Sequence, residues 1–221
     1  MTKSRTKTAT WVGIVLSGIL ALWFWNSPVL WPVKVLVVLF HELGHAIATW
    51  LTGGTVLEIG LSPQVGGHAL SSGGNRLAIL NAGYLGSLLW GVALLGVARR
   101  KGTSRYALGI LGAVVFGVAL WYVRPFASFG FAFGLIMGAV LMVGGRLLPV
   151  TAAQVVLRAL GVFSILYALF DVRDDVFYAG SDVVSDATML AAATGIPSVV
   201  WGAAWLVAGV AVLWFTRKWV T

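Results

Sequence analysis

Long runs of apolar residues, separated by short polar segments, dominate the chain from residue 11 to residue 215. A helix that crosses the hydrocarbon core of a bilayer needs about 20 predominantly apolar residues. The pattern therefore predicts six or seven membrane-spanning helices, over Trp11–Trp25, Val29–Leu51, Leu77–Ala98, Tyr106–Val123, Phe126–Leu148, Ala152–Phe170 and Pro197–Phe215. We expect an all-α multi-pass membrane protein that forms a single membrane-embedded domain over residues 1–221.

Two segments depart from this pattern. The first follows the second predicted helix and reads "GTVLEIGLSPQVGGHALSSGG". Its short alternating runs are broken by Pro63 and by the pair Gly66-Gly67, which predicts a β-hairpin-like loop. The second segment, residues 171–196, is too polar at first to span a membrane. It then offers a short apolar helix with Ser185 as N-cap, which we expect to be interfacial or re-entrant and to precede the last span.

The composition supports a location in the cell membrane, with the lipid bilayer as a partner of the chain. Hydrophobic residues make up 59% and charged residues 10%, whereas soluble domains average roughly 45–50% and about 25%. The net charge of +8 does not indicate nucleic-acid binding, because the basic residues lie mostly at the ends of apolar runs. Charges in these places anchor and orient membrane helices.

Two histidines and a glutamate lie inside the second apolar run, in "FHELGHAIATWLTGG" (residues 40–54). His41 and His45 are four residues apart and therefore share one face of a helix. Two imidazoles at this spacing can bind one Zn²⁺, and Glu42 can act as general base on a water that the zinc activates. Ionisable groups inside a membrane helix are costly and mark functional sites. The motif thus predicts His41 and His45 as zinc ligands and Glu42 as the catalytic base.

A catalytic zinc normally has three protein ligands and one open position. The chain has no cysteine, so the third ligand is expected among the remaining histidine and acidic residues, which are His68, Glu58, Asp171, Asp174, Asp175, Asp182 and Asp186. Counting membrane crossings places Asp171 and Asp186 near the end of the motif helix. Asp171 is the first choice, because a negative charge is unfavourable at a helix C-terminus and therefore points to another role. Asp186 is the alternative, although an aspartate in a first helical turn also complements the helix dipole.

Three further polar residues are candidates for contact with a substrate. Glu58 alternates with apolar residues in "VLEIGL", as the polar face of a strand would. A free strand edge beside zinc could hold an extended peptide by β-augmentation. His68 follows in the same loop, where it could also be an ordinary interfacial histidine. Asn81 lies within the third predicted helix and could instead form an interhelical hydrogen bond.

These motifs together resemble the site-2 protease family of intramembrane zinc metalloproteases, and in particular its small B-type bacterial branch. The matching pieces are "HELGHAIATWLTGG", "NAGYLGSLLWG", "LYALFDVRDDVF" and "SDATMLAAATGIPSVVWGAAW", in that order. The resemblance implies a helical membrane core and a zinc bound by His41, His45 and a distant aspartate, with Glu42 as base. Family members carry that aspartate in an L-D-G or N-P-D-G motif after an "LLP"-like turn. This chain has "LLPVTAAQ" at Leu147–Gln154 instead, so the third ligand is displaced or the site is altered.

We therefore expect intramembrane proteolysis by a zinc metalloendopeptidase, a hydrolase that acts on a membrane protein or peptide substrate. The alternative is a catalytically inactive membrane protein that keeps this fold and binds or scaffolds a partner, which the missing L-D-G motif favours. A metal or small-solute transporter would need polar residues along several helices. The later helices offer few beyond Arg158.

Overall fold

A computed structural model describes residues 27–173 and 185–220. The predicted helix Trp11–Trp25 and three of the candidate aspartates, Asp174, Asp175 and Asp182, lie outside the described residues. Residues 1–33 and 34–221 form separate compact units, and the sites discussed below lie in the second. That the chain forms one domain stays a prediction.

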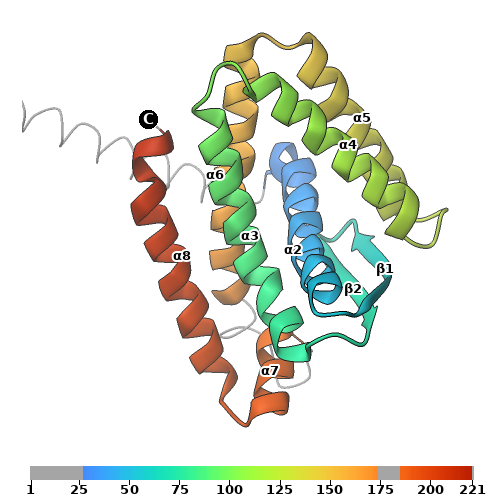
Figure 1. Cartoon of the computed structure of the whole chain (residues 1–221), viewed down its shortest axis with the longest axis vertical. Coiled ribbons are helices and arrows are strands. Elements are labelled where there is room, and N and C mark those ends of the chain that lie inside the picture. Colours follow the sequence, from blue (N-terminus) through green and yellow to red (C-terminus); the bar gives the residue numbers. More distant parts are fainter. Residues whose placement is uncertain (1–26, 174–184, 221) are drawn as a thin grey trace, which may run out of the picture. The chain divides into compact units, whose positions relative to one another are not determined.

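Helices make up most of the described chain (Figure 1). A single 3₁₀ turn, η1 (Pro28–Leu30), precedes α2 (Trp31–Leu51), and the strands β1 (Thr55–Ser62) and β2 (Gly66–Ser72) follow. The remaining elements are α3 (Arg76–Ala98), α4 (Ser104–Tyr122), α5 (Phe129–Leu147), α6 (Val150–Arg173), α7 (Asp186–Thr194) and α8 (Ser198–Val220). In the described part, six helices are long and apolar enough to cross a membrane. The structure thus confirms an all-α multi-pass membrane fold with one hairpin.

The helices largely cover the predicted apolar runs, although α6 and α8 extend beyond theirs, to Arg173 and Val220. The helix α5 begins at Phe129 rather than at the predicted Phe126, because the hydroxyl of Ser128 accepts the backbone N–H of Phe131 at 3.2 Å. The helix α7 begins where the sequence predicts, with Ser185 and Thr188 forming a reciprocal capping box. With nine residues, α7 is about 14 Å long, too short to span a bilayer.

Glycines allow close contacts between neighbouring helices. On α5, a Cβ at Gly138 would lie 2.7 Å from the backbone nitrogen of Phe116 on α4, so the two backbones nearly touch. Gly130 at the start of the same helix lies against Leu61, where a Cβ would come within 2.9 Å, and this brings α5 onto the hairpin. Without side chains at these positions, backbones can pack closely in an apolar environment.

The hairpin is antiparallel and has an irregularity between Val56 and Glu58. It is joined to α2, since the hydroxyl of Thr49 lies 2.9 Å from the Ser71 hydroxyl. On its other side, β1 meets the connection between α4 and α5. Ile59 forms a parallel bridge with Val123, and the N–H of Arg124 donates to the carbonyl of Ile59 at 3.1 Å. The hairpin is therefore attached at both strands, through Ser71 of β2 to α2 and through Ile59 of β1 to the α4–α5 connection.

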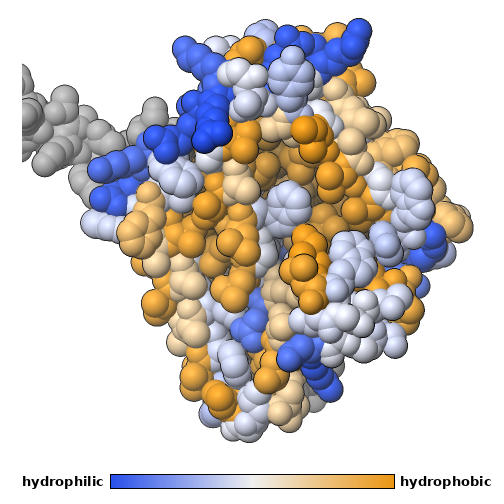
Figure 2. Space-filling view, viewed as in Figure 1, coloured by the Kyte–Doolittle hydropathy of each residue, from blue (hydrophilic) through white to orange (hydrophobic). Residues whose placement is uncertain are grey.

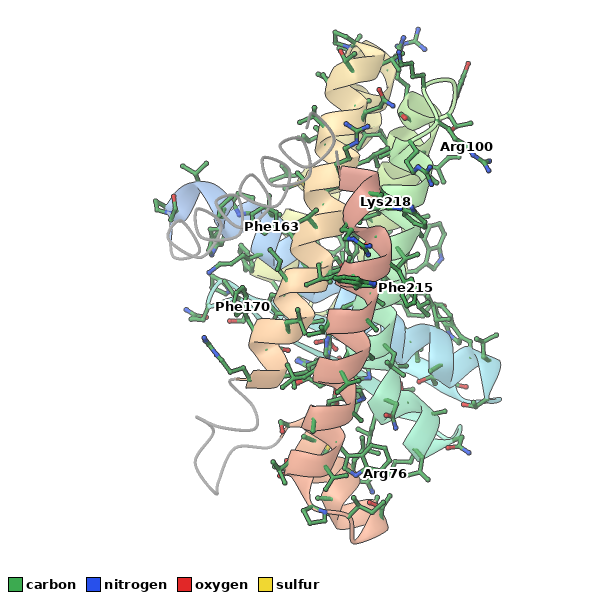
Figure 3. The ribbon with its side chains drawn as sticks, turned by 90° about the vertical axis from the view of Figure 1, so that its left-hand side faces the viewer. Arg76, Arg100, Phe163, Phe170, Phe215 and Lys218 are labelled. Atoms are coloured by element: carbon green, nitrogen blue, oxygen red, sulfur yellow. The ribbon has the colours of Figure 1, made fainter. Side chains whose placement is uncertain are left out.

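The two ends of the unit 34–221 differ in character. At one end α3, α5 and α8 finish and α4 and α6 begin, whereas the hairpin and α7 lie at the other end (Figure 1). Arg100 and Lys218 lie towards the first end and Arg76 lies at the second, with Phe163, Phe170 and Phe215 between them (Figure 3). The space-filling view shows the same order, a largely apolar surface below a cluster of hydrophilic residues (Figure 2). This arrangement is expected of a membrane protein whose apolar middle zone faces lipid.

Candidate metal centre

The central part of α2 is apolar and buried, and the motif residues lie within it. Every residue from Val35 to Ala46 is buried, including His41, Glu42 and His45. Helical spacing brings the two imidazoles together, with 4.8 Å between their ring centroids. Burying such groups costs free energy unless they have partners, so a compensating group is required.

That group is Asp186, the first residue of α7. Its Oδ2 lies 3.3 Å from Nε2 of His41 and 3.2 Å from Nε2 of His45. The three ligand atoms lie within 4.8 Å of one another. Ligands in a tetrahedron with metal–ligand bonds of about 2.0–2.1 Å are separated by about 3.3–3.4 Å, which matches the two aspartate–histidine distances.

The Asp186 oxygen has no hydrogen-bond partner among the described residues, although it is buried. A buried carboxylate oxygen that faces two imidazole nitrogens without a hydrogen bond is the arrangement that a shared cation would satisfy. Burial by itself would raise the pKa of the Asp186 carboxyl. The close pairing with His41 and His45 outweighs this and lowers that pKa to about 2. The carboxyl group is therefore ionised at neutral pH, as a metal ligand must be.

The His45 ring is oriented by a backbone group of the neighbouring helix. Its Nδ1 lies 2.7 Å from the carbonyl oxygen of Ile79 on α3. Because a carbonyl only accepts, Nδ1 carries the proton that it donates, and Nε2 on the Asp186 side is the nitrogen available to a metal. The His41 ring is held differently, edge-on against Tyr84 with 4.9 Å between centroids, and Tyr84 in turn packs on Trp205.

Two glycines allow α3 to approach α2 closely enough to contact His41 and His45. A Cβ at Gly83 would clash with Nε2 of His41 and lie 2.6 Å from Nε2 of His45. A Cβ at Gly44, between the two histidines, would clash with the carbonyl of Ala82. The space beside the imidazoles therefore depends on the absence of side chains from both helices.

A cavity of about 390 Å³ opens beside the three ligand atoms. Glu42 lines it together with His41, His45 and Asp186, and residues Gly66 to Ala69 of β2 form part of its wall. Glu42 lies next to this strand, because a Cβ at Gly67 would lie 2.7 Å from its Oε1. The candidate metal ligands, a carboxylate and a strand thus share one cavity.

The other predicted site residues have different places. Asp171 lines the same cavity but does not belong to the group of three ligand atoms. His68 also lines it, and its Nε2 lies 3.5 Å from Oε1 of Glu58 across the hairpin. Asn81 does not line this cavity. Its Oδ1 accepts the indole N–H of Trp205 at 3.0 Å, so that it joins α3 to α8, and it borders a separate apolar groove between α2 and α3.

Several residues of the site were not predicted from the sequence. Tyr84, Tyr167 and Met189 line the cavity, and Gly83 lies against the imidazoles. Gly83 and Gly86 do suggest close packing in "NAGYLGSLLWG". Tyr84 is adjacent to Gly83 in this stretch, and the pairing of a small residue with an aromatic one could have pointed to it. Tyr167 and Met189 have no comparable signal.

Membrane-spanning helices around a buried group of two histidines and an aspartate define a membrane protein with a candidate metal centre. A family model described as Peptidase M50B-like matches residues 14–216, and the chain belongs to this family. This match confirms the resemblance to site-2 proteases and agrees with the B-type branch. Comparison with curated proteins and with solved structures gave no match.

Proposed function

We propose that this protein is an intramembrane zinc metallopeptidase of the cell membrane, which hydrolyses peptide bonds in or near the bilayer. One observation carries the proposal. Oδ2 of Asp186 lies 3.2–3.3 Å from both imidazole Nε2 atoms, in a cavity that Glu42 also lines. Membership of a peptidase family supports the same function.

Three residues fit the metal. His41, His45 and Asp186 provide two nitrogen donors and one oxygen donor, a set typical of catalytic zinc, which keeps a further position for water or substrate. The buried Asp186 oxygen without a hydrogen bond supports this assignment. When bound there, zinc would lower the pKa of a water and polarise the peptide carbonyl.

Glu42 has the role of general base. Its carboxylate takes a proton from the attacking water and then gives a proton to the nitrogen of the leaving amine. Position supports this role, since Glu42 follows His41 directly, is buried and lines the cavity. The short distance to Gly67 brings the carboxylate next to the backbone of β2, where a peptide would bind.

The geometry of the hairpin indicates how a peptide would be held. In an antiparallel pair, a residue directs both its N–H and its C=O either towards the partner strand or away from it. The Ile59 carbonyl faces away from β2, because it accepts the N–H of Arg124. Ile59 pairs with Ala69, so Ala69 also directs its backbone groups away from the hairpin, on the outer edge of β2. Gly67, two residues earlier, does the same.

A substrate segment could therefore add to β2 as a third strand beside Glu42. Strand addition would hold the peptide extended, which hydrolysis requires because helical backbone groups are already hydrogen-bonded. His68 lies on β2 itself, and Glu58 of β1 lies 3.5 Å from its Nε2, so both are candidates for side-chain contacts with the substrate.

Replacing Ala69 with proline tests this mode of binding. Proline removes the N–H that Ala69 directs to the outer edge, and it is tolerated on edge strands. We expect Ala69→Pro to lower the rate of hydrolysis about tenfold, roughly the value of one good hydrogen bond, with the zinc content unchanged. Ala69→Val keeps the N–H and should retain most activity. Equal rates for Ala69→Pro and the wild type would rule out binding at this edge.

The zinc content of the purified protein tests the proposal as a whole. We expect about one zinc per chain in the wild type, little in His41→Ala, and loss of hydrolysis after chelation with recovery on adding zinc. The probes are fluorophore–quencher peptides, each an apolar span with helix-breaking residues at its centre. Carefully prepared protein without zinc would contradict the metallopeptidase. Zinc without turnover of any probe would favour the binding or scaffold protein instead.

A further inference from the structure

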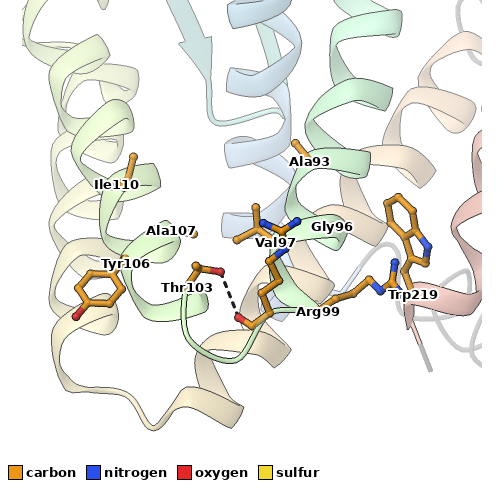
Figure 4. Close-up of a pocket in the computed structure, with 10 residues that line it drawn as sticks. Ala93, Gly96, Val97, Arg99, Thr103, Tyr106, Ala107, Ile110 and Trp219 are labelled. Atoms are coloured by element: carbon orange, nitrogen blue, oxygen red, sulfur yellow. Dashed lines mark hydrogen bonds between the residues drawn. The ribbon is translucent and has the colours of Figure 1, made fainter.

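A groove at the end opposite the hairpin combines cationic and apolar walls. It has a volume of about 900 Å³ and lies between the end of α3, the start of α4 and the last turn of α8. Arg99 at the end of α3 extends beside Trp219 of α8, and Tyr106 of α4 lies across the opening (Figure 4). The guanidinium carbon of Arg99 is 5.2 Å from the centre of the Trp219 ring.

The groove changes character along the helices. Arg99, Arg100 and Thr103 line it where the chain turns from α3 to α4, and this turn forms the surface at that end. Further along, its walls are Ala93, Gly96 and Val97 of α3 and Ala107 and Ile110 of α4. Both helices are long and apolar enough to cross a membrane. In a spanning orientation these apolar walls face lipid chains and the arginines meet the headgroups.

Among the described residues, the charged side chains at this end are all basic. The segments that meet there carry the basic residues Arg99, Arg100, Lys101, Arg105, Arg146, Arg217 and Lys218. The four described acidic residues lie elsewhere: Glu42 in α2, Glu58 in β1, Asp171 in the last turn of α6 and Asp186 at the start of α7. Arg105 is already engaged with the backbone carbonyl of Gly145, at 3.2 Å, whereas both arginines of the groove are exposed to solvent. A ligand that complements these walls carries an anionic group on an apolar chain.

We propose that this groove binds one anionic phospholipid. Arg99 and Arg100 contact the phosphate, Tyr106 and Trp219 flank the headgroup, and an acyl chain lies along α3 and α4. Arginine forms charge-assisted hydrogen bonds with phosphate, and basic pockets between membrane helices suit anionic headgroups. Aromatic side chains at this depth are typical of the membrane interface. The site is separate from the metal centre and does not depend on the proposed hydrolysis.

The test compares two lipids that differ only in headgroup charge. The full-length protein in detergent is incubated with equal amounts of phosphatidylglycerol and phosphatidylcholine of identical chains, and the retained lipids are counted by native mass spectrometry. We expect one retained phosphatidylglycerol in preference to phosphatidylcholine. Each of Arg99→Gln and Arg100→Gln should weaken retention about fivefold, and the double variant about thirtyfold.

Lys101→Gln is the matched control, because it removes the same charge from the same turn but does not line the groove. It should change retention less than twofold. Inorganic phosphate and glycerol phosphate, added as competitors, distinguish a lipid site from a site for free anions. The proposal is overturned if no lipid is retained, if both lipids are retained equally, or if the arginine variants behave like Lys101→Gln. Complete displacement by millimolar inorganic phosphate would also overturn it.

Discussion

Glu42→Gln should abolish hydrolysis while the protein keeps about one zinc per chain. The amide has nearly the same size and shape as the carboxylate, so the buried position beside Gly67 should accept it. An amide cannot take up the proton of the attacking water. General acid–base catalysis contributes about 10²–10⁴-fold, and we expect at least that loss in kcat.

Zinc content and thermal unfolding, measured on the same preparation, separate loss of the base from loss of the fold. Glu42→Asp is the informative companion, since it keeps a carboxylate but withdraws it by one methylene. It should recover part of the activity. Cleavage of the probe peptides by Glu42→Gln at the wild-type rate would show that another group acts as base.

The second large effect distinguishes the two aspartates of the cavity. Asp186→Asn should weaken zinc binding more than about 100-fold, because even the loss of a group that merely orients a ligand costs 10–100-fold. Asp171 lines the cavity without belonging to the group of three ligand atoms. Asp171→Asn should therefore leave zinc affinity within about twofold of the wild type. Titration with a competing chelator gives both affinities.

The two variants form a matched pair, since each replaces a carboxylate of the same cavity with its isosteric amide. The reverse outcome, with zinc lost in Asp171→Asn and kept in Asp186→Asn, would assign the third ligand to Asp171. Loss of zinc in both would mean that the two carboxylates hold the metal together. Asp186→Asn leaves the Ser185–Thr188 capping box intact, so α7 should still form.

The helices could be predicted because a bilayer demands long apolar runs, whatever the tertiary structure. Their ends could not always be predicted, because hydrogen bonds of single polar side chains decide them, as Ser128 does at the start of α5. The hairpin was recognisable from Pro63 and the paired glycines, since these residues interrupt regular structure locally. Its attachment at Ile59 joins distant segments and has no local signal.

The candidate metal centre, too, could be predicted only in part from the sequence. His41, Glu42 and His45 belong to one helical turn, so their spacing alone brings them together. Counting crossings places both Asp171 and Asp186 near that turn, and the unfavourable negative charge at a helix C-terminus favours Asp171 as the ligand. The structure brings Asp186 to the imidazoles, because its place in the first turn of α7 lets it both complement the dipole and face His41 and His45. The preference for aspartate in a first helical turn therefore does not exclude that the same residue also binds a metal.

The division of the ligand set between two helices has an energetic consequence. A cation held by α2 and α7 would join the two helices. Cation binding and the docking of α7 would therefore be linked equilibria, each of which favours the other. Docking depends on the packing of Ala187 and Leu190 against a cluster that includes Tyr84 and Trp205. A change in α8 that loosens this packing would therefore lower metal affinity without touching a ligand. In return, the bound metal would raise the free energy of unfolding of α7 and of the part of α8 that packs against it.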